Sequence, residues 1–142
     1  MRRYRRRPLA KVRSLMKPGL PAADPSEPLA QVAGRMRADR VGAMAVMDRG
    51  GLVGIITERD LLRAMADGMS PVATHAGDCM TAEPWTIGSD EEAVDAAEKM
   101  LAHGIRHLPV VEEGRVVGLI SARDLLELGR RVPLDELSYE PW

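Results

Sequence analysis

A phrase that occurs twice in the chain places a hydroxyl group close to a carboxylate. Its sequence is GIITERDLL at residues 54–62 and GLISARDLL at residues 118–126. In each copy a hydroxyl residue, Thr57 or Ser121, stands three positions before an aspartate, Asp60 or Asp124. A carboxylate can accept hydrogen bonds from two neighbouring hydroxyl groups, and a hydroxyl, an arginine or a helix N-terminus can donate to an oxyanion. Each copy therefore has groups suited to a ligand that carries both hydroxyl and acidic groups.

The same spacing also has a structural interpretation. The pairs Thr57/Asp60 and Ser121/Asp124 match the capping box, in which the first and fourth residues of a helix start satisfy each other's backbone N–H groups. The phrase nevertheless follows a predicted strand, begins with glycine and occurs twice, which favours a ligand site. The two interpretations are compatible, because the hydroxyl can cap the helix in the empty site and turn to a bound ligand. Glycine at 54 and 118 would let a ligand or a neighbouring backbone approach the strand closely.

The phrase belongs to a longer internal repeat. Residues 14–62 align with residues 78–126 without a gap. The identical pairs include Met16 and Met80, Glu27 and Glu91, Met36 and Met100, Val46 and Val110, and Gly50 and Gly114. A chain of 142 residues is the size of one domain, whereas each half alone would be marginally stable. We therefore expect two small units that share one structure.

Each unit shows the same order of hydrophobic patterns. Apolar residues recur at helical spacing over 29–36 and 93–100, and short β-branched runs follow at 43–47 and 52–56, and at 108–111 and 116–120. A second helix is expected after Thr57 and Ser121, with its apolar residues pointing inward: Leu61, Leu62 and Met65 in one copy, and Leu125, Leu126 and Leu128 in the other. Helices on one side of a small sheet leave the other face apolar, and the twin sheet can cover it.

The combined pattern resembles a known family. The phrase MTAEP at residues 80–84, the strand HLPVV at residues 107–111 and the doubled phrase are similar to those of a pair of CBS domains (cystathionine β-synthase domains, a Bateman module). The first copy departs from this pattern, because Lys17 follows Met16 and Ala45 replaces the strand proline found as Pro109. The resemblance implies the α/β (α+β) class, with two tandem β-α-β-β-α repeats packed through their sheets as a pseudo-two-fold pair.

We divide the chain accordingly. The segments are a basic N-terminal arm at 1–9, CBS repeat 1 at 10–70, CBS repeat 2 at 74–131 and an acidic C-terminal tail at 132–142. The resemblance implies a stand-alone regulatory module that binds adenosine-type nucleotides (AMP, ADP, ATP or S-adenosylmethionine) in clefts between the repeats and signals by conformational change. It also implies a homodimer that acts on a regulated protein, with no catalysis and no required cofactor beyond the regulatory adenosine ligand.

The resemblance also implies which residues line the two clefts, because one repeat holds ribose and phosphate while the other contacts the base. For the Asp124 cleft, here called cleft 2, we expect Ser121, Asp124, Arg123, Arg106, His107, Leu119, Val41 and Gly42. For the Asp60 cleft, called cleft 1, we expect Thr57, Asp60, Arg59, Ile55, Ile105 and Ile87. The positions that match Arg106 and His107 in the first repeat are Gly42 and Ala43. We therefore predict that cleft 2 binds the more highly charged nucleotide.

Charge is distributed unevenly along the chain. Residues 1–17 contain eight basic residues and no acidic one, so the remainder carries a charge of -9 within a net charge of -1. The basic arm contributes Arg2, Arg3, Arg5, Arg6 and Arg7 as possible contacts to nucleic-acid phosphates. An alternative function is therefore nucleic-acid binding through this arm on a CBS scaffold. A simpler interpretation is a solvated arm that lies against the acidic body.

Several other classes of function are not expected. The longest apolar runs contain about five residues, whereas a membrane span needs roughly 20, so no membrane association is predicted. A single cysteine, Cys79, cannot form an internal disulfide, which is consistent with a reducing cytoplasm. His103 and His107 are separated by Gly104 at the predicted helix end, so they would not share a helix face and no metal site is expected. No nucleophile, paired carboxylates or phosphate loop indicates an enzyme.

Overall fold

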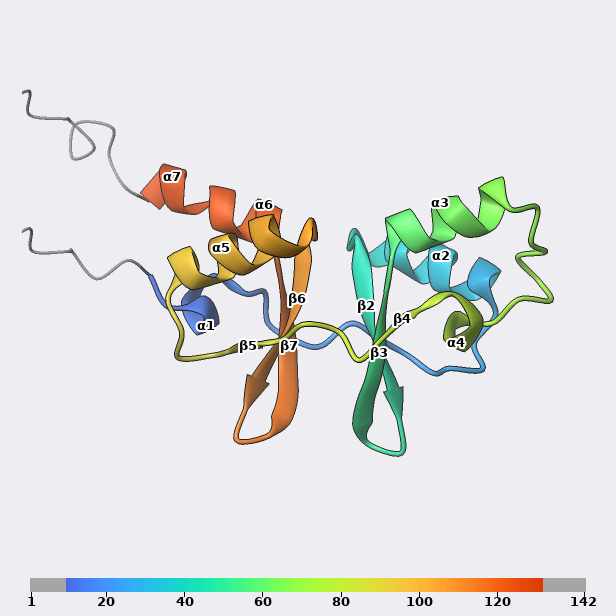
Figure 1. The fold of residues 1–142 in the computed structure, drawn as a ribbon, viewed down its shortest axis with the longest axis horizontal. Coiled ribbons are helices and arrows are strands. Elements are labelled where there is room, and N and C mark those ends of the chain that lie inside the picture. Colours follow the sequence, from blue (N-terminus) through green and yellow to red (C-terminus); the bar gives the residue numbers. More distant parts are fainter. Residues whose placement is uncertain (1–9, 132–142) are drawn as a thin grey trace, which may run out of the picture.

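The computed structural model describes residues 10–131 of the chain (Figure 1). The basic arm at 1–9 and the acidic tail at 132–142 lie outside the described residues, so the predictions made for them, including nucleic-acid contacts by Arg2, Arg3, Arg5, Arg6 and Arg7, stay predictions. The first half contains α1 (Val12–Leu15), β1 (Ala22–Ala23), α2 (Leu29–Asp39), β2 (Ala43–Asp48), β3 (Gly51–Thr57) and α3 (Glu58–Ala66). The second half contains α4 (Ala76–Cys79), β4 (Thr81–Ala82), β5 (Ile87–Gly88), α5 (Ala93–His103), β6 (His107–Glu112), β7 (Arg115–Ser121), α6 (Ala122–Leu126) and α7 (Leu128–Arg131).

The strands form two small sheets of matching topology. One sheet has the order β1-β2-β3-β4 and the other the order β5-β6-β7. In each, a short strand pairs in parallel with the first strand of an antiparallel hairpin. Both hairpins turn through two residues with positive φ, which are Arg49–Gly50 (φ 50° and 79°) and Glu113–Gly114 (φ 49° and 76°). Such turns match the natural twist of the strands. The predicted repeat of strand, helix, strand, strand and helix is therefore confirmed.

The first helix of each half packs in the other half. Val12 and Leu15 of α1 belong to the hydrophobic core formed by β5, β6, β7 and α5, whereas Ala76 of α4 belongs to the core formed by α2, α3, β2 and β3. Backbone hydrogen bonds hold each helix in the other half. The N–H of Val12 donates to the carbonyl oxygen of Glu91, and the N–H of Gly77 donates to the carbonyl oxygen of Pro25. In Figure 1 the chain crosses between the two lobes after α1 and again after β4. These two crossing segments run along the clefts between the lobes.

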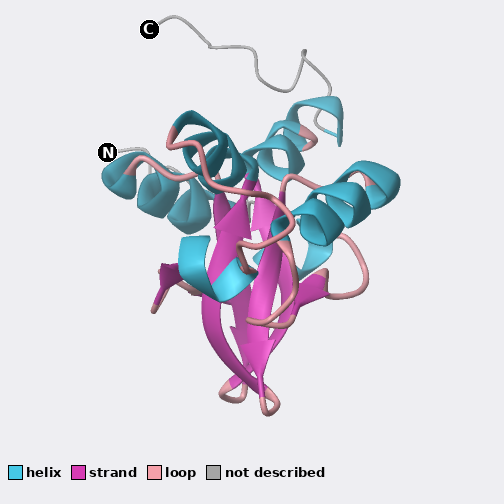
Figure 2. Ribbon diagram, turned by 90° about the vertical axis from the view of Figure 1, so that its right-hand side faces the viewer, coloured by secondary structure: helices cyan, strands magenta, loops and turns pink. Residues whose placement is uncertain are grey.

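The two sheets pack against each other through their faces that point away from the helices. Strands β3 and β7 are in contact across the lobes. Ala45, Ile55 and Pro109 are buried but belong to neither hydrophobic core. Figure 2 shows the helices gathered around one end of the strands, while both hairpin turns extend from the opposite end. The predicted packing of the sheets as a pair is confirmed.

The expected orientation of the second helix in each half is wrong for several residues. Leu62, Met65 and Leu126 are 65%, 77% and 78% exposed. In α3 the buried positions are Asp60 and Ala64, one helical turn apart, so Leu62 and Met65 fall on the outer face. The aspartate of the phrase thus occupies the inward position that apolar periodicity alone would give to leucine.

Candidate functional site

The two repeated phrases form matching junctions between a strand and a helix. The backbone N–H of Thr57 donates to Oδ2 of Asp60 at 2.9 Å, and the N–H of Ser121 donates to Oδ2 of Asp124 at 2.8 Å. In return, the N–H of Asp60 donates to Oγ1 of Thr57 at 3.4 Å, and the N–H of Asp124 donates to Oγ of Ser121 at 3.1 Å. Both junctions are complete capping boxes, so the structural interpretation of the phrase holds.

The capping box leaves each aspartate with acceptor capacity. Asp60 and Asp124 are each 5% exposed, and the cap uses Oδ2 in both. Within residues 10–131, Oδ1 of Asp124 has no hydrogen bond or ion pair, whereas Oδ1 of Asp60 lies 3.6 Å from Nη1 of Arg63. A carboxylate has about four lone-pair sites, so a capping aspartate can still accept two further hydrogen bonds. Asp124 is the more available of the two.

Cleft 2 is a wide space between the lobes. Its volume is about 1280 Å³, and it is lined from the second half by β6, β7 and α6 and from the first half by α2, β2, α3 and the crossing segment 17–21. Its lining includes every residue that the sequence predicted for this cleft: Ser121, Asp124, Arg123, Arg106, His107, Leu119, Val41 and Gly42. The space exceeds the roughly 300 to 1,000 Å³ typical of small-molecule pockets.

Cleft 1 is much smaller, with a volume of about 180 Å³. Five of the six residues predicted for it line this space: Ile55, Thr57, Arg59, Asp60 and Ile105. The exception, Ile87, is a correction, because it is 1% exposed and lies in the core beneath α5. Ile87 pairs with Val110 in the sheet, which turns its side chain away from the cleft. Pro84 and Trp85, which precede β5, form that wall instead.

Arg59 and Trp85, which line cleft 1, both contact the C-terminal end of α5. Nη1 of Arg59 donates to the carbonyl oxygen of Gly104 at 3.2 Å. The indole of Trp85 stacks on the imidazole of His103, with 3.9 Å between the ring centroids and 12° between the planes. Sequence reasoning did not find the pairing of Trp85 with His103, because the two residues come from separate elements and no local pattern connects them.

A wall shared by both clefts separates them. Gly42, Glu58, Arg106 and His107 line cleft 1 as well as cleft 2. The comparison of the repeats had suggested that Arg106 belongs to cleft 2 alone. In the structure it lines both clefts. Burial lowers the pKa of His107, an effect that Glu58 and Asp124 oppose and Arg106 reinforces. A side chain at Gly42 would bring its Cβ to 3.1 Å from Nε2 of His107, so glycine permits this close packing.

A comparison with known proteins identifies the family. The family model of the CBS domain matches residues 12–67 and 76–131. The chain belongs to the CBS domain family. The CBS domain-containing protein YhcV of Bacillus subtilis is 31% identical over 121 residues, which cover 82% of this chain and 84% of YhcV. The chain spans only 16% to 62% of the length of several other curated relatives.

Solved CBS structures share the fold. The chain resembles the CBS domain protein PAE2072 from Pyrobaculum aerophilum, described as complexed with AMP, at a TM-score of 0.76 and 30% identity, covering 85% of this chain and 99% of that one. It also resembles the CBS domain pair of protein MJ0100, described in complex with 5′-methylthioadenosine and S-adenosyl-L-methionine, at a TM-score of 0.80 and 26% identity. That match covers 88% of this chain and 100% of the other.

Three cations of cleft 2 were not predicted. Lys17, Arg37 and Arg40 line this cleft together with Arg106 and Arg123. The repeat alignment could have indicated them. The matching positions in the second CBS repeat are uncharged, namely Thr81, Leu101 and Gly104. Arg40 ends α2 in the left-handed region with φ 55°, where glycine is usual and where the second repeat has Gly104 with φ 62°. A cation thus occupies a backbone position that favours glycine.

The glycines of the repeated phrase serve close chain packing. A Cβ at Gly54 would lie 2.9 Å from the carbonyl oxygen of Thr81, and a Cβ at Gly118 would lie 3.0 Å from Sδ of Met16. Of the two roles considered for these glycines, approach of a neighbouring chain segment is the one that the structure shows. Both neighbours belong to the segments that cross between the CBS repeats.

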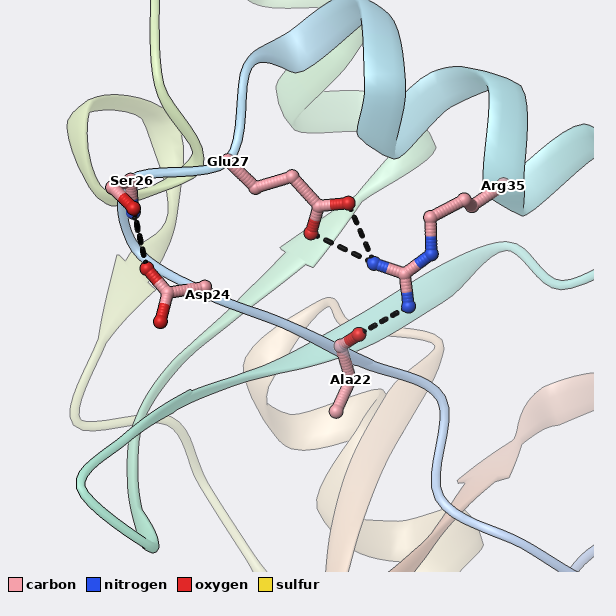
Figure 3. Close-up of polar contacts among 5 residues, drawn as sticks. All are labelled: Ala22, Asp24, Ser26, Glu27 and Arg35. Atoms are coloured by element: carbon pink, nitrogen blue, oxygen red, sulfur yellow. Dashed lines mark hydrogen bonds and ion pairs between the residues drawn. The ribbon is translucent and has the colours of Figure 1, made fainter.

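The crossing segments are held by different polar contacts in the two repeats. In the first, Nη1 of Arg35 donates at 2.7 Å to both carboxylate oxygens of Glu27, and Nη2 donates at 2.5 Å to the carbonyl oxygen of Ala22 (Figure 3). In the second, Nζ of Lys99 donates only to the carbonyl oxygen of Thr86, at 2.8 Å. Lys99 matches Arg35 in the repeat, so the bidentate arrangement belongs to the first repeat and fixes the segment that leads into cleft 2.

Other candidate chemistry is sparse in the described part of the chain. No group of three or more His, Cys, Asp and Glu side chains among residues 10–131 could hold a metal ion. Burial raises the pKa of the Cys79 thiol, and Asp78, Asp60 and Asp67 add to this effect, so the thiol stays protonated. None of the helices within residues 10–131 combines the length and apolar character that crossing a membrane requires.

Proposed function

We propose that this CBS pair is a regulatory module that binds adenosine-type nucleotides in the clefts between its repeats. The observation that carries the proposal is a large cleft lined by cations and by Asp124, whose Oδ1 has no hydrogen bond or ion pair within residues 10–131. A carboxylate can bind both ribose hydroxyls, while Ser121 and the arginines around it can donate to phosphate. Two structural relatives are described with AMP or with S-adenosyl-L-methionine, which supports an adenosine ligand for this chain.

The two clefts are proposed to differ in the charge of their ligand. Cleft 2 is lined by five basic residues, Lys17, Arg37, Arg40, Arg106 and Arg123, against three acidic ones, Asp39, Glu58 and Asp124. Cleft 1 has three basic residues, Arg59, Arg63 and Arg106, against two acidic ones, Glu58 and Asp60. Two of the cleft 1 arginines already contact protein groups, whereas the side chains of the five cleft 2 cations have no hydrogen-bond or ion-pair partner within residues 10–131, and the larger space suits a longer phosphate chain. Cleft 2 therefore takes the more highly charged nucleotide.

Binding alone can produce the signal. A nucleotide in either cleft contacts elements of both repeats, so it favours the angle between the lobes at which those contacts are best. The module would then regulate another protein or domain through the changed surface. This mechanism requires no reaction and no cofactor other than the nucleotide.

A matched pair of substitutions tests the proposal. Asp124→Asn and Asp60→Asn keep a carbonyl oxygen for the capping box but replace the second acceptor by an N–H₂ donor, which cannot accept from ribose. We expect ATP and ADP to stabilise the wild-type protein in a thermal-shift panel with AMP, S-adenosylmethionine, NAD(H) and GTP. Calorimetry should show that Asp124→Asn weakens ATP binding by about ten- to a hundredfold. An absence of saturable adenosine-nucleotide binding would overturn the proposal.

We also propose that two copies associate through their helices. Apolar side chains are exposed on α3, α5 and α6, namely Leu62, Met65, Val94, Leu101 and Leu126. Light scattering of the eluting protein should give the mass of a dimer, and Leu101→Glu with Leu126→Glu should shift it to a monomer. Val72→Glu is the matched control, because Val72 is 73% exposed but lies in a loop outside these helices. A monomeric wild-type protein would contradict the dimer.

A further inference from the structure

The wall shared by the two clefts lies where the chain enters the second helix of each repeat. The backbone N–H of Glu58 donates to the carbonyl oxygen of Gly42 at 3.0 Å. In the same way, the N–H of Ala122 donates to the carbonyl oxygen of Arg106 at 2.8 Å. Glu58 matches Ala122 in the repeat, and Gly42 matches Arg106, so each repeat brings one charged and one small residue to this place. Among the described residues that line both clefts, Arg106 is the only arginine or lysine.

Arg106 is placed to turn toward either cleft. It is exposed, and within residues 10–131 its guanidinium has no hydrogen-bond or ion-pair partner. The matching residue, Gly42, has no side chain that could serve one of the clefts in its place. A planar guanidinium makes its strongest contact with a phosphate through two parallel hydrogen bonds, and this geometry commits it to one oxyanion. Arg106 can therefore pair fully with a ligand in one cleft or in the other, but not in both.

The clefts depend on Arg106 to different extents. In cleft 1 the other two arginines already have protein partners. Arg59 donates to the carbonyl oxygen of Gly104 at 3.2 Å, and Nη1 of Arg63 lies 3.6 Å from Oδ1 of Asp60. Cleft 2 has four more cations whose side chains have no such partner within residues 10–131, namely Lys17, Arg37, Arg40 and Arg123. An anion in cleft 1 thus relies on Arg106, whereas an anion in cleft 2 has other donors as well.

We infer that the two clefts compete for Arg106, so that an anionic ligand in one cleft weakens the binding of an anionic ligand in the other. The inference rests on the proposed function of the clefts. When cleft 2 is filled, Arg106 turns to that ligand. Cleft 1 then keeps the carboxylates of Glu58 and Asp60, with no unpartnered cation among the described residues that line it. By linkage, a ligand in cleft 1 weakens binding in cleft 2 by the same factor.

The charge of the ligand distinguishes this competition from a change in the angle between the lobes. A change of angle alters the contacts of every ligand that spans the two repeats, whether the ligand is charged or not. Competition for Arg106 acts only on ligands that carry a negative charge. AMP should therefore show the coupling, and adenosine, which has the same base and ribose, should not.

Calorimetry on the full chain measures the coupling. Asp124→Asn and Asp60→Asn give the association constants of AMP for cleft 1 and cleft 2 taken singly, and the wild-type chain gives the two stepwise constants. We expect the product of the stepwise constants to be about tenfold lower than the product of the single-cleft constants. We call this ratio the deficit. Adenosine should show no deficit.

Two further substitutions locate the coupling. Arg106→Ala, made in the wild-type chain and in both aspartate variants, should reduce the deficit for AMP to about twofold or less. Arg123→Ala, made in the same three chains, is the matched control, because Arg123 is also exposed but lines only cleft 2. It should weaken binding in cleft 2 and leave the deficit at about tenfold.

The outcomes separate this inference from the proposed function. No deficit for AMP in the wild-type chain, or the same deficit for AMP and adenosine, would refute the competition while the proposed nucleotide function stands. A deficit that persists undiminished in Arg106→Ala would refute it as well, because the shared guanidinium would then not be its source. If AMP, ATP and adenosine bind neither cleft of the wild-type chain, the proposed function fails instead.

Discussion

Cleft 1 and cleft 2 contain the same phrase at the same strand-to-helix junction, but they differ in size and charge. The capping aspartates accept their backbone hydrogen bonds at 2.9 Å and 2.8 Å, and both are 5% exposed. The clefts differ because each takes its phrase from one repeat and its opposite wall from the other. In cleft 2 the wall supplies Lys17, Arg37 and Arg40, whereas in cleft 1 it supplies Pro84, Trp85 and Ile105.

This arrangement separates the residues that both repeats require from the residues that can differ between them. The phrase caps a helix and packs its glycine against a crossing segment, so its residues are required by the fold of both repeats. The opposite walls lie on exposed helix ends and connecting segments, where substitutions have little effect on the core. A repeat protein can therefore acquire two different binding sites while its two halves keep one fold.

The largest expected effect concerns the polar contacts that hold the crossing segments. Arg35→Ala leaves the carboxylate of Glu27, whose side chain is 7% exposed, without its partner, while the lost guanidinium was itself 41% exposed. We expect a loss of about 2 kcal/mol in the free energy of unfolding, below the 3–5 typical of fully buried pairs because water screens the arginine. Lys99→Ala removes one hydrogen bond to Thr86 and should cost about 1 kcal/mol or less.

Urea denaturation measures both changes. The double variant Glu27→Gln with Arg35→Ala is the control, because it removes the buried charge together with its partner and should be more stable than Arg35→Ala alone. Nucleotide affinity of cleft 2 should also fall in Arg35→Ala, since Arg35 holds Ala22 beside the cleft-lining residues Leu20 and Pro21. Equal losses for Arg35→Ala and Lys99→Ala would show that the two repeats are held in the same way.

The next prediction concerns nucleotide binding by the wall that the two clefts share. Arg106 lines both clefts, whereas Arg123 lines only cleft 2. Arg106→Ala should therefore weaken nucleotide binding in both clefts by about tenfold, and Arg123→Ala should do so only in cleft 2. Calorimetry with ATP in the Asp60→Asn background isolates cleft 2, and AMP in the Asp124→Asn background isolates cleft 1. An unchanged affinity of cleft 1 in Arg106→Ala would mean that the clefts are chemically independent.

Much of this architecture could be predicted from the sequence because it depends on local signals. The hairpin turns follow from glycine at 50 and 114, and the helix starts follow from the hydroxyl and aspartate of the phrase. The resemblance to a pair of CBS domains, rather than the repeat itself, indicated the residues that meet in cleft 2. The turns and helix starts involve residues close in sequence, so pattern and propensity are sufficient for them.

The remaining features depend on contacts between distant segments. The sequence gives no indication that α1 packs in the second half and α4 in the first, because these four-residue helices bury only Val12, Leu15 and Ala76. The outward positions of Leu62 and Met65 follow from the inward position of Asp60, which periodicity assigns to the polar side. Ile87 was assigned to cleft 1 from its position in an extended segment, and only its pairing with Val110 shows that it faces the core.

The smallest expected effect is a pH dependence that His107 imposes on the shared wall. Burial lowers the pKa of His107, Arg106 lowers it further, and Glu58 and Asp124 act in the opposite direction. The unfolded chain has an ordinary histidine pKa of about 6.5, so below this pH it binds a proton that the empty folded protein resists. The empty protein should therefore lose stability as the pH falls from about 6.5 toward the lowered pKa of His107.

A bound phosphate should reverse this preference, because its negative charge near His107 favours the imidazolium. The affinity for a nucleotide should then rise as the pH falls from 7.5 to 6, by about threefold and by no more than tenfold per pH unit. The phosphate itself titrates near pH 6, so the comparison must be made with His107→Asn, in which only the phosphate contribution remains. Calorimetry in buffers of different ionisation enthalpy should detect proton uptake in the wild-type protein that His107→Asn lacks. The same pH profile in both proteins would place the phosphate away from His107.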